Sequence, residues 1–322
     1  MAALADTDGK AVVCYGECLI DFLGGRNADG SLAPFTPYPG GAPANVAVAV
    51  ARLGGRAAFL GQVGTDMFGD FLADALARYG VDTSPLARHA AAPTSLAFVS
   101  LDASGERSFS FRRDGSADLA ITASDIDRLW PAQSAFFHHC SNMLTDVAIA
   151  DVSAHAVARA KAAGALVSFD ANLRPALWLD GKVDRACVDT FARSADIVKL
   201  AREELEFLAE GSADAYLDSL LSSGVSLVFI TDGAAPARVK SRTHDFEVPC
   251  PEVAAVDTTG AGDAFCGGLL YALSRLGHLP EDRETLQGIT TFAAACGAHA
   301  VTRQGAFPAM PCFTNVAAWP FD

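Results

Sequence analysis

Short apolar stretches alternate with longer, helix-like stretches along most of this chain. The apolar runs have the length of buried strands, and buried strands separated by helices are typical of a parallel sheet covered on both faces. The pattern therefore predicts an α/β fold. The predicted strands lie within residues 11–23, 57–63, 135–140, 166–169, 197–200 and 227–231. The predicted helices cover residues 45–53, 68–79, 151–163 and 264–276, with Gly80 and Gly164 placed to cap two of them.

Residues 94–113 break this alternation. Two β-like arms, 94–101 and 106–113, flank the turn sequence Asp-Ala-Ser-Gly, and aromatic residues alternate with polar ones in the second arm. The pattern predicts a hairpin in a small sheet that projects from the main domain, and residues 31–39 are a candidate further strand. Such a sheet could serve as a lid, and its exposed edge makes a homodimer through the lid a reasonable expectation.

Length and composition predict one compact unit. The chain has 322 residues, of which 51% are hydrophobic, and this is enough for a sizeable core. No low-complexity linker or internal repeat divides it. We therefore expect a single domain over residues 1–322, with lid segments at about 29–39 and 94–115 inserted within it.

The charge balance excludes several classes of partner. Acidic residues outnumber basic ones, 38 to 24, and the formal net charge is −14, so neither nucleic acid nor an anionic membrane is an expected partner. The start of the chain has no secretory signal pattern, and the longest apolar run, 42–51, is far shorter than the roughly 20 residues that span a bilayer. Eight cysteines without a Cys-x-x-Cys pair favour reduced thiols in a cytoplasmic protein.

The most informative stretch is Asp-Thr-Thr-Gly-Ala-Gly-Asp-Ala-Phe at residues 257–265, just before a helix-like pattern. Gly260, Ala261 and Gly262 leave backbone amides open at a helix start, where they can hold a phosphate group. A carboxylate beside such an anion hole can accept the proton of an attacking hydroxyl, which makes Asp263 a candidate general base. Taken alone, the two glycines and the carboxylate favour a helix-capping Asp in a glycine-rich loop.

A second stretch changes that judgement. Residues 40–47 read Gly-Gly-Ala-Pro-Ala-Asn-Val-Ala, in which paired glycines allow close backbone approach and Asn45 offers a donor and an acceptor. Together the two stretches resemble the motifs of the ribokinase-like carbohydrate kinases, the PfkB family, and the resemblance covers nearly the whole chain. It implies a ribokinase-like three-layer α/β sandwich with a central, mostly parallel sheet and a small β-sheet lid. It also implies a kinase that transfers a phosphoryl group from ATP to a sugar with the help of Mg²⁺.

Further stretches are similar to the fructokinase and 2-keto-3-deoxygluconate kinase branch of that family. They are Phe-Asp-Ala-Asn-Leu-Arg at 169–174 and Phe-Arg-Arg at 111–113, followed by Ala-Asp-Leu at 117–119. The last of these favours D-fructose as the substrate, converted to D-fructose 6-phosphate. The keto acid is the alternative, since arginines could bind its carboxylate. The resemblance implies that the sugar is held by Asp21, Gly40, Gly41, Asn45, Arg113, Asn172 and Arg174.

Nucleotide and cation sites are also implied by the resemblance. ATP is expected at the strand ends, near Lys199, Glu204, Thr231, Gly233, Gly260, Gly262 and Ala294. The family's Asn-x-x-Glu motif keeps its Glu at 204 but has Ala201 in place of Asn, so the direct Asn contact is lost. A potassium ion is expected at Asp257, Thr259, Ala300, Arg303 and Gly305.

Other phosphate-binding classes fail specific tests. No Gly-Lys pair is followed by Ser or Thr, as a Walker loop requires, and no Gly-x-Gly-x-x-Gly fingerprint follows the first strand. A sugar-binding regulatory protein is the non-enzymatic alternative. It would be expected to lack the base, yet Asp263 is present with both glycines, so an enzyme is favoured.

Overall fold

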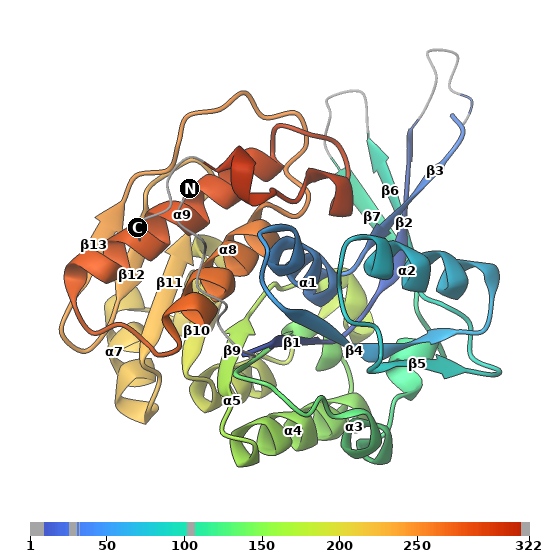
Figure 1. Ribbon diagram of the computed structural model, residues 1–322, viewed down its shortest axis with the longest axis horizontal. Helices are drawn as coiled ribbons and strands as arrows, with labels where there is room; N and C mark the ends of the chain where they lie inside the picture. Colours follow the sequence, from blue (N-terminus) through green and yellow to red (C-terminus); the bar gives the residue numbers. More distant parts are fainter. Residues whose placement is uncertain (1–9, 26–30, 32, 102–106, 317–322) are drawn as a thin grey trace.

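The computed structural model describes residues 10–25, 31, 33–101 and 107–316. Its centre is a nine-stranded sheet in the order β13-β12-β11-β10-β9-β8-β1-β4-β5 (Figure 1). The seven strands from β11 to β5 pair in parallel, and β12 and β13 extend the edge in antiparallel fashion. The strands are β1 (Val12–Tyr15), β4 (Ala57–Gly64), β5 (Leu86–His89), β8 (Phe136–Cys140), β9 (Leu166–Asp170), β10 (Ile197–Ala201), β11 (Leu227–Thr231), β12 (Ala237–Lys240) and β13 (Asp245–Val248).

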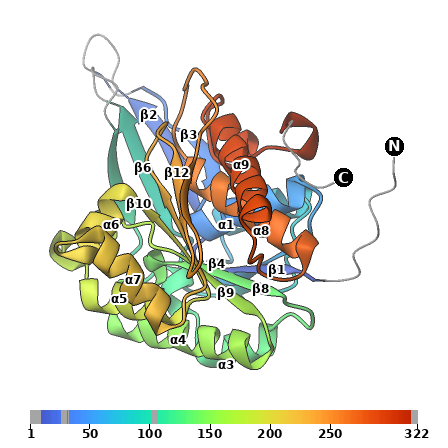
Figure 2. The same cartoon turned by 90° about the vertical axis from the view of Figure 1, so that its left-hand side faces the viewer.

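Two helix layers enclose this sheet, as Figure 2 shows. One layer holds α1 (Ala42–Arg52), α2 (Met67–Arg78), α8 (Ala261–Leu276) and α9 (Arg283–Ala300). The other holds α3 (Ala123–Leu129), α4 (Val147–Ala162), α5 (Arg185–Ser194), α6 (Arg202–Ala209) and α7 (Ala213–Ser223). Strand alternation divides the core accordingly: Val12 and Cys14 join the apolar cluster under the first layer, and Val13 and Tyr15 join the cluster under the second. The predicted three-layer α/β arrangement is confirmed.

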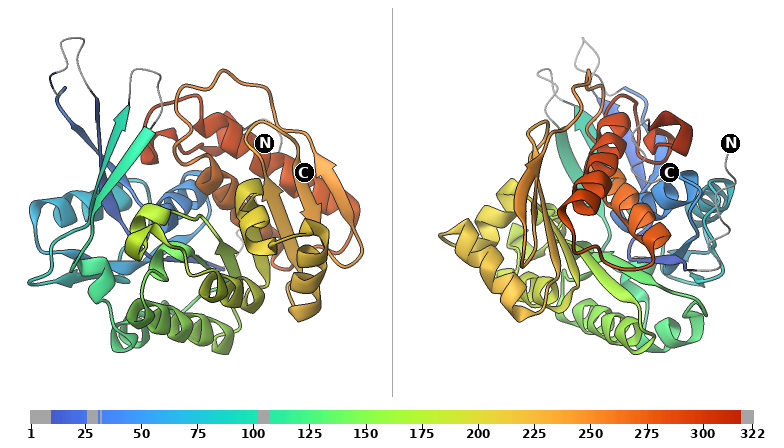
Figure 3. Two further views of the ribbon diagram at one scale, coloured as in Figure 1. Left: turned by 180° about the vertical axis from the view of Figure 1, so that it is seen from behind. Right: turned by 60° about the vertical axis from the view of Figure 1, so that its left-hand side comes forward.

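A separate four-stranded sheet projects from the strand ends (Figure 3). Its order is β3-β2-β6-β7, made of β2 (Leu19–Gly25), β3 (Thr36–Gly40), β6 (Leu96–Leu101) and β7 (Arg107–Arg112). The predicted hairpin is confirmed by antiparallel pairing of β6 with β7, and the candidate further strand is present as β3. The predicted turn at 102–105 lies outside the described residues.

Several element boundaries differ from the sequence-based expectation. The β-rich run at 11–23 is divided between the two sheets. Its first part forms β1 of the large sheet and its last part begins β2 of the small sheet, and residues 16–18 connect the two strands. Helix α1 begins earlier than expected, at Ala42, with Pro43 in its first turn. Helix α4 also begins earlier, because Asp146 accepts hydrogen bonds from the amides of Ala148 and Ile149. The antiparallel pair β12 and β13 was not anticipated.

Within the described ranges, no helix is both long and apolar enough to cross a bilayer.

Candidate active site

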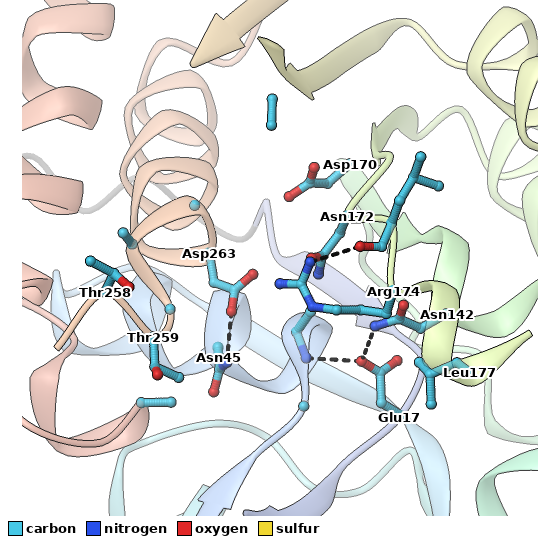
Figure 4. Close-up of a pocket in the computed structure, with 18 of the residues that line it drawn as sticks. Glu17, Asn45, Asn142, Asp170, Asn172, Arg174, Leu177, Thr258, Thr259 and Asp263 are labelled. Atoms are coloured by element: carbon cyan, nitrogen blue, oxygen red, sulfur yellow. Dashed lines mark hydrogen bonds between the residues drawn. The ribbon is translucent and has the colours of Figure 1, made fainter. Parts of the chain in front are cut away.

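A cleft of about 980 Å³ opens where the parallel strands end, between the large sheet, the small sheet and the start of α8. The last residues of three neighbouring strands, Asp170, Ala201 and Thr231, line it. Ligands of open α/β sheets bind outside the carboxyl ends of the strands, so the cleft is in the expected place. In Figure 4 the labelled side chains converge from β9 and the loop after it, from α1 and from α8.

The start of α8 forms one wall of the cleft. Gly260 precedes the helix in the left-handed conformation with φ of 75°, and Ala261 is the first helical residue. The amides of the first turn have no partner within the helix, and the helix dipole adds positive potential there. A Cβ atom on Gly262 would lie 3.1 Å from the Lys199 Nζ, so glycine leaves room for that ammonium group beside the turn. The three predicted anion-hole residues therefore line the cleft together.

Asp263 lies in the first turn of α8 and is held by Asn45 of α1. The Asn45 Nδ2 donates to the Asp263 Oδ2 at 2.7 Å (Figure 4). Burial raises the pKa of Asp263 to about 6, against the lowering effects of the Asn45 hydrogen bond and of the Arg174 and Lys199 charges. A carboxylate with a pKa near 6 is ionised at neutral pH and is still basic enough to take a proton.

A second acidic group, Asp21 of β2, faces the same space. Burial raises the pKa of Asp21 to about 7, and the negative charges of Asp263 and Glu17 add to the effect. Gly40 does not line the cleft, but a Cβ atom there would come within 2.1 Å of the Asp21 Oδ2. Gly41, with φ of 107°, does line it, and a Cβ atom there would meet the Glu17 carbonyl oxygen at 2.4 Å. The paired glycines thus make space for the acidic floor of the cleft.

The loop after β9 contributes Asn172 and Arg174. Asn172 is buried with φ of 38°, a left-handed conformation that Asn tolerates better than most residues. The exposed Arg174 points into the cleft in Figure 4, and its positive charge acts to lower the pKa of both Asp21 and Asp263. This loop therefore places a cation opposite the two carboxylates.

Arg113 is not brought into the cleft. It is buried just beyond β7, where its Nε lies 2.6 Å from the Asp118 Oδ2 and its guanidinium donates to the Asn142 carbonyl oxygen at 2.6 Å. The sequence suggested a direct sugar contact for this residue. Its observed position is behind the cleft wall, where a buried ion pair occupies the guanidinium.

A buried cation lies at the end of β10. The Lys199 Nζ is 3.1 Å and 3.3 Å from the two carboxylate oxygens of Asp170, and both side chains are buried. Burial alone would lower the pKa of Lys199, but the charges of Asp170 and Glu204 outweigh it and raise that pKa. The Glu204 carboxylate accepts hydrogen bonds from the amides of Ala201 at 2.7 Å and Leu173 at 2.8 Å. Glu204 therefore ties two cleft loops together.

The residues expected around a potassium ion lie in adjoining loops. The Asp257 carboxylate accepts hydrogen bonds from the amides of Thr259 at 2.8 Å and Gly305 at 3.1 Å. The Ala300 carbonyl oxygen accepts one from the amide of Arg303 at 3.3 Å. Asp257, Thr259 and Gly305 line the cleft beside the start of α8.

Most of the predicted site residues thus share one cleft, and a few do not. Those lining it are Asp21, Gly41, Asn45, Asn172, Arg174, Lys199, Glu204, Thr231, Asp257, Thr259, Gly260, Ala261, Gly262, Asp263 and Gly305. Those outside its lining are Gly40, Arg113, Gly233, Ala294, Ala300 and Arg303. Asn142 lines the cleft but was not anticipated, because it stands in no motif and reaches the site only through the turn after β8.

Comparisons with known proteins identify the family. The family model described as pfkB family carbohydrate kinase matches residues 10–311. The chain is 41% identical over 312 residues to probable fructokinase-7 of Arabidopsis thaliana, covering 95% of this chain and 91% of that one.

Two solved structures are close in fold. The fructokinase of Xylella fastidiosa with bound ATP has a TM-score of 0.89 and 44% identity, covering 95% of this chain and 97% of that one. A double-mutant fructokinase of Vibrio cholerae O395, in fructose, ADP and potassium ion bound form, has a TM-score of 0.85 and 36% identity, covering 97% and 98%. With a family match that spans almost its whole length and an anion-hole turn beside a buried carboxylate, the chain belongs to the pfkB family of carbohydrate kinases.

Proposed function

We propose that this chain is an ATP-dependent fructokinase that converts D-fructose to D-fructose 6-phosphate. The observation that carries the proposal is Asp263, a carboxylate held by Asn45 beside the open amides of Gly260 to Gly262 in the strand-end cleft. The similarity to fructokinases of plants and bacteria supports fructose as the sugar.

The proposed step is a direct transfer. The 6-hydroxyl oxygen of fructose forms a bond to the γ-phosphorus, the bond from that phosphorus to the β–γ bridging oxygen breaks, and ADP leaves with the electron pair. The hydroxyl proton passes to the Asp263 carboxylate. The amides of Gly260, Ala261 and Gly262 stabilise the negative charge that develops on the transferring group.

The remaining cleft residues position the two substrates. Asp21, Gly41, Asn45, Asn172 and Arg174 orient the sugar. Lys199 and Thr231 lie on the nucleotide side, next to the α8 turn. Two residues of the small sheet, Val99 and Phe111, line the cleft on the side proposed for the sugar. This position suits a lid that keeps water from the γ-phosphate. A cytoplasmic location and a homodimer through this lid remain predictions.

The cations belong to the proposal as well. Within the described ranges no three His, Cys, Asp or Glu side chains form a metal-binding group. The Asp170 and Glu204 carboxylates line the cleft and fit Mg²⁺, which commonly takes most of its ligands from substrate phosphates and water. The ion would neutralise phosphate charge. The loops joined by Asp257 fit a potassium ion held by that carboxylate and by backbone carbonyl groups.

The decisive experiment is ADP release with ATP and Mg²⁺, comparing D-fructose, 2-keto-3-deoxygluconate and D-ribose in parallel. We expect saturable turnover on fructose with the highest kcat/KM. A preference for the keto acid would contradict the proposal and would make Arg174 the ligand of its carboxylate. No measurable ADP release with any of the sugars would favour a sugar-binding protein without kinase activity.

The pH dependence tests the base directly. Because Asp263 must be ionised to act, kcat/KM for fructose should rise with pH and level off above the pKa values of Asp263, about 6, and Asp21, about 7. Replacing Asp21 with Asn removes the higher of these two ionisations, so the midpoint of the remaining activity should move down from about 7 toward the Asp263 pKa of about 6. A profile that is flat between pH 5 and pH 8 would contradict the assignment. The measurement is kcat/KM at constant ionic strength.

A further inference from the structure

Two buried amide oxygens have no hydrogen-bond partner in the described part of the chain. They are the Oδ1 atoms of Asn45 and Asn142, residues that are only 4% and 5% exposed. Both residues line the cleft. A buried acceptor without a partner costs free energy, so such atoms in a binding site indicate a ligand that brings donors.

A carboxylate fixes the orientation of each amide. The Asn45 Nδ2 donates to the Asp263 Oδ2 at 2.7 Å, and the Asn142 Nδ2 donates to the Glu17 Oε1 at 2.9 Å. Because the NH₂ group of each asparagine donates to a carboxylate oxygen, its amide oxygen must point elsewhere. Figure 4 draws both hydrogen bonds among the residues that line the cleft. The site therefore presents a fixed acceptor at each asparagine.

Glu17 is itself held firmly. It is 1% exposed, and its Oε1 also accepts a hydrogen bond from the amide of Ala42 at 2.9 Å, at the start of α1. Burial raises the pKa of Glu17, while the positive charge of Arg113 and the Asn142 hydrogen bond act in the opposite direction. The buried Arg113 cation behind the cleft wall thus partly compensates the buried Glu17 carboxylate.

The same arginine fixes the backbone of Asn142. The Arg113 guanidinium donates to the Asn142 carbonyl oxygen at 2.6 Å and is anchored by its ion pair with Asp118. Asp118 in turn accepts hydrogen bonds from the hydroxyl groups of Ser95 and Ser116. Asn142 is therefore held at its side chain by Glu17 and at its backbone by Arg113.

We infer that Asn142 is a specificity-determining residue, whose Oδ1 accepts a hydrogen bond from one hydroxyl group of the sugar, and that Glu17 is its positioning residue. The identity of the sugar rests on the proposed function. The hydroxyl group concerned is not the one that is phosphorylated, because Asn45 and Asp263 form a separate pair at the start of α8. Asn142 contributes to sugar affinity and Glu17 keeps its acceptor turned toward the sugar.

The variants Asn142→Ala and Glu17→Gln test this inference in the full chain. Each should raise the KM for fructose about tenfold, the loss expected for one hydrogen bond, and should change kcat and the KM for ATP far less. The double variant should lose little more than either single variant, because both act on the same contact. Ser153→Ala is the matched control: Ser153 is buried and donates to the Met143 carbonyl oxygen in the same turn, but it does not line the cleft. It should leave the KM for fructose unchanged.

Deoxy sugars locate the partner hydroxyl. Wild-type enzyme should lose about tenfold in kcat/KM with one monodeoxyfructose, and Asn142→Ala should show no such difference between that analogue and fructose. The inference would be overturned if every deoxy analogue lowered kcat/KM by the same factor in Asn142→Ala as in the wild type. It would also be overturned if Asn142→Ala left the KM for fructose unchanged. Either result would leave the proposed function intact. If the wild type phosphorylates another sugar instead, fructose specificity fails, and the same comparison with that sugar decides the inference. A wild type that neither binds nor phosphorylates any sugar overturns both.

Discussion

Replacing Asp263 with Asn should lower kcat for fructose phosphorylation by about 10²–10⁴-fold, the usual contribution of a general base. The substitution keeps the shape of the side chain, and an amide oxygen can still accept the hydrogen bond from the Asn45 Nδ2. What disappears is a group that can take the proton of the sugar hydroxyl. Sugar binding should therefore survive, which separates a loss of chemistry from a loss of structure.

Two measurements check this result. Coupled ADP release gives kcat, and isothermal titration calorimetry gives the Kd for fructose. The matched control is Asp282→Asn, since Asp282 also begins a helix, α9, where it accepts a hydrogen bond from the amide of Thr285, but lies outside the cleft. Turnover near the wild-type value in Asp263→Asn would refute the base assignment.

Replacing Lys199 with Met should cost about 3–5 kcal/mol in the free energy of unfolding, because it leaves the buried Asp170 carboxylate without its cation. It should also raise the KM for ATP, since the ammonium group lies beside the Gly262 turn, on the nucleotide side of the cleft. Urea unfolding at pH 7 and steady-state kinetics measure the two effects.

A double variant separates these two effects. Lys199→Met combined with Asp170→Asn removes both buried charges, and replacing a whole ion pair is often close to neutral for stability. Stability should largely return, whereas the KM for ATP should stay high. The control Arg202→Met breaks the exposed ion pair with Asp232 and should leave the unfolding midpoint nearly unchanged. Recovery of the KM for ATP in the double variant would show that Lys199 acts on nucleotide binding only through the fold.

Local pattern was enough to predict the layers of the fold. Residues 57–63 and 227–231 form strands as expected, because a short apolar run can be buried on both faces only inside a covered sheet. Local pattern could not divide residues 11–23 between two sheets. That division depends on the turn at Gly16, which has φ of 150° and where a Cβ atom would lie 2.6 Å from the Pro43 side chain of the distant helix α1.

The candidate site shows the same contrast between what local sequence predicts and what the fold decides. Motif residues such as Asn45 and Asp263 were identified from the sequence, and the structure brings them into one hydrogen bond across 218 residues. The partnership of Glu17 with Asn142, which are 125 residues apart, has no local signal. Arg113 was assigned to the sugar from its motif, yet it is buried in an ion pair with Asp118 behind the cleft.

The sequence by itself determined the α/β class, the glycine-rich turn before α8 and the acid that follows it, because each depends on neighbouring residues and on backbone freedom. Only the tertiary structure decided which polar groups are buried together, and therefore which of them have a hydrogen-bond partner within the protein and which are left to bind a ligand. The physical reason is that burial and electrostatic coupling act through space. The raised pKa values of Asp21 and Asp263 and the free acceptor of Asn142 arise from elements that meet only in the folded chain.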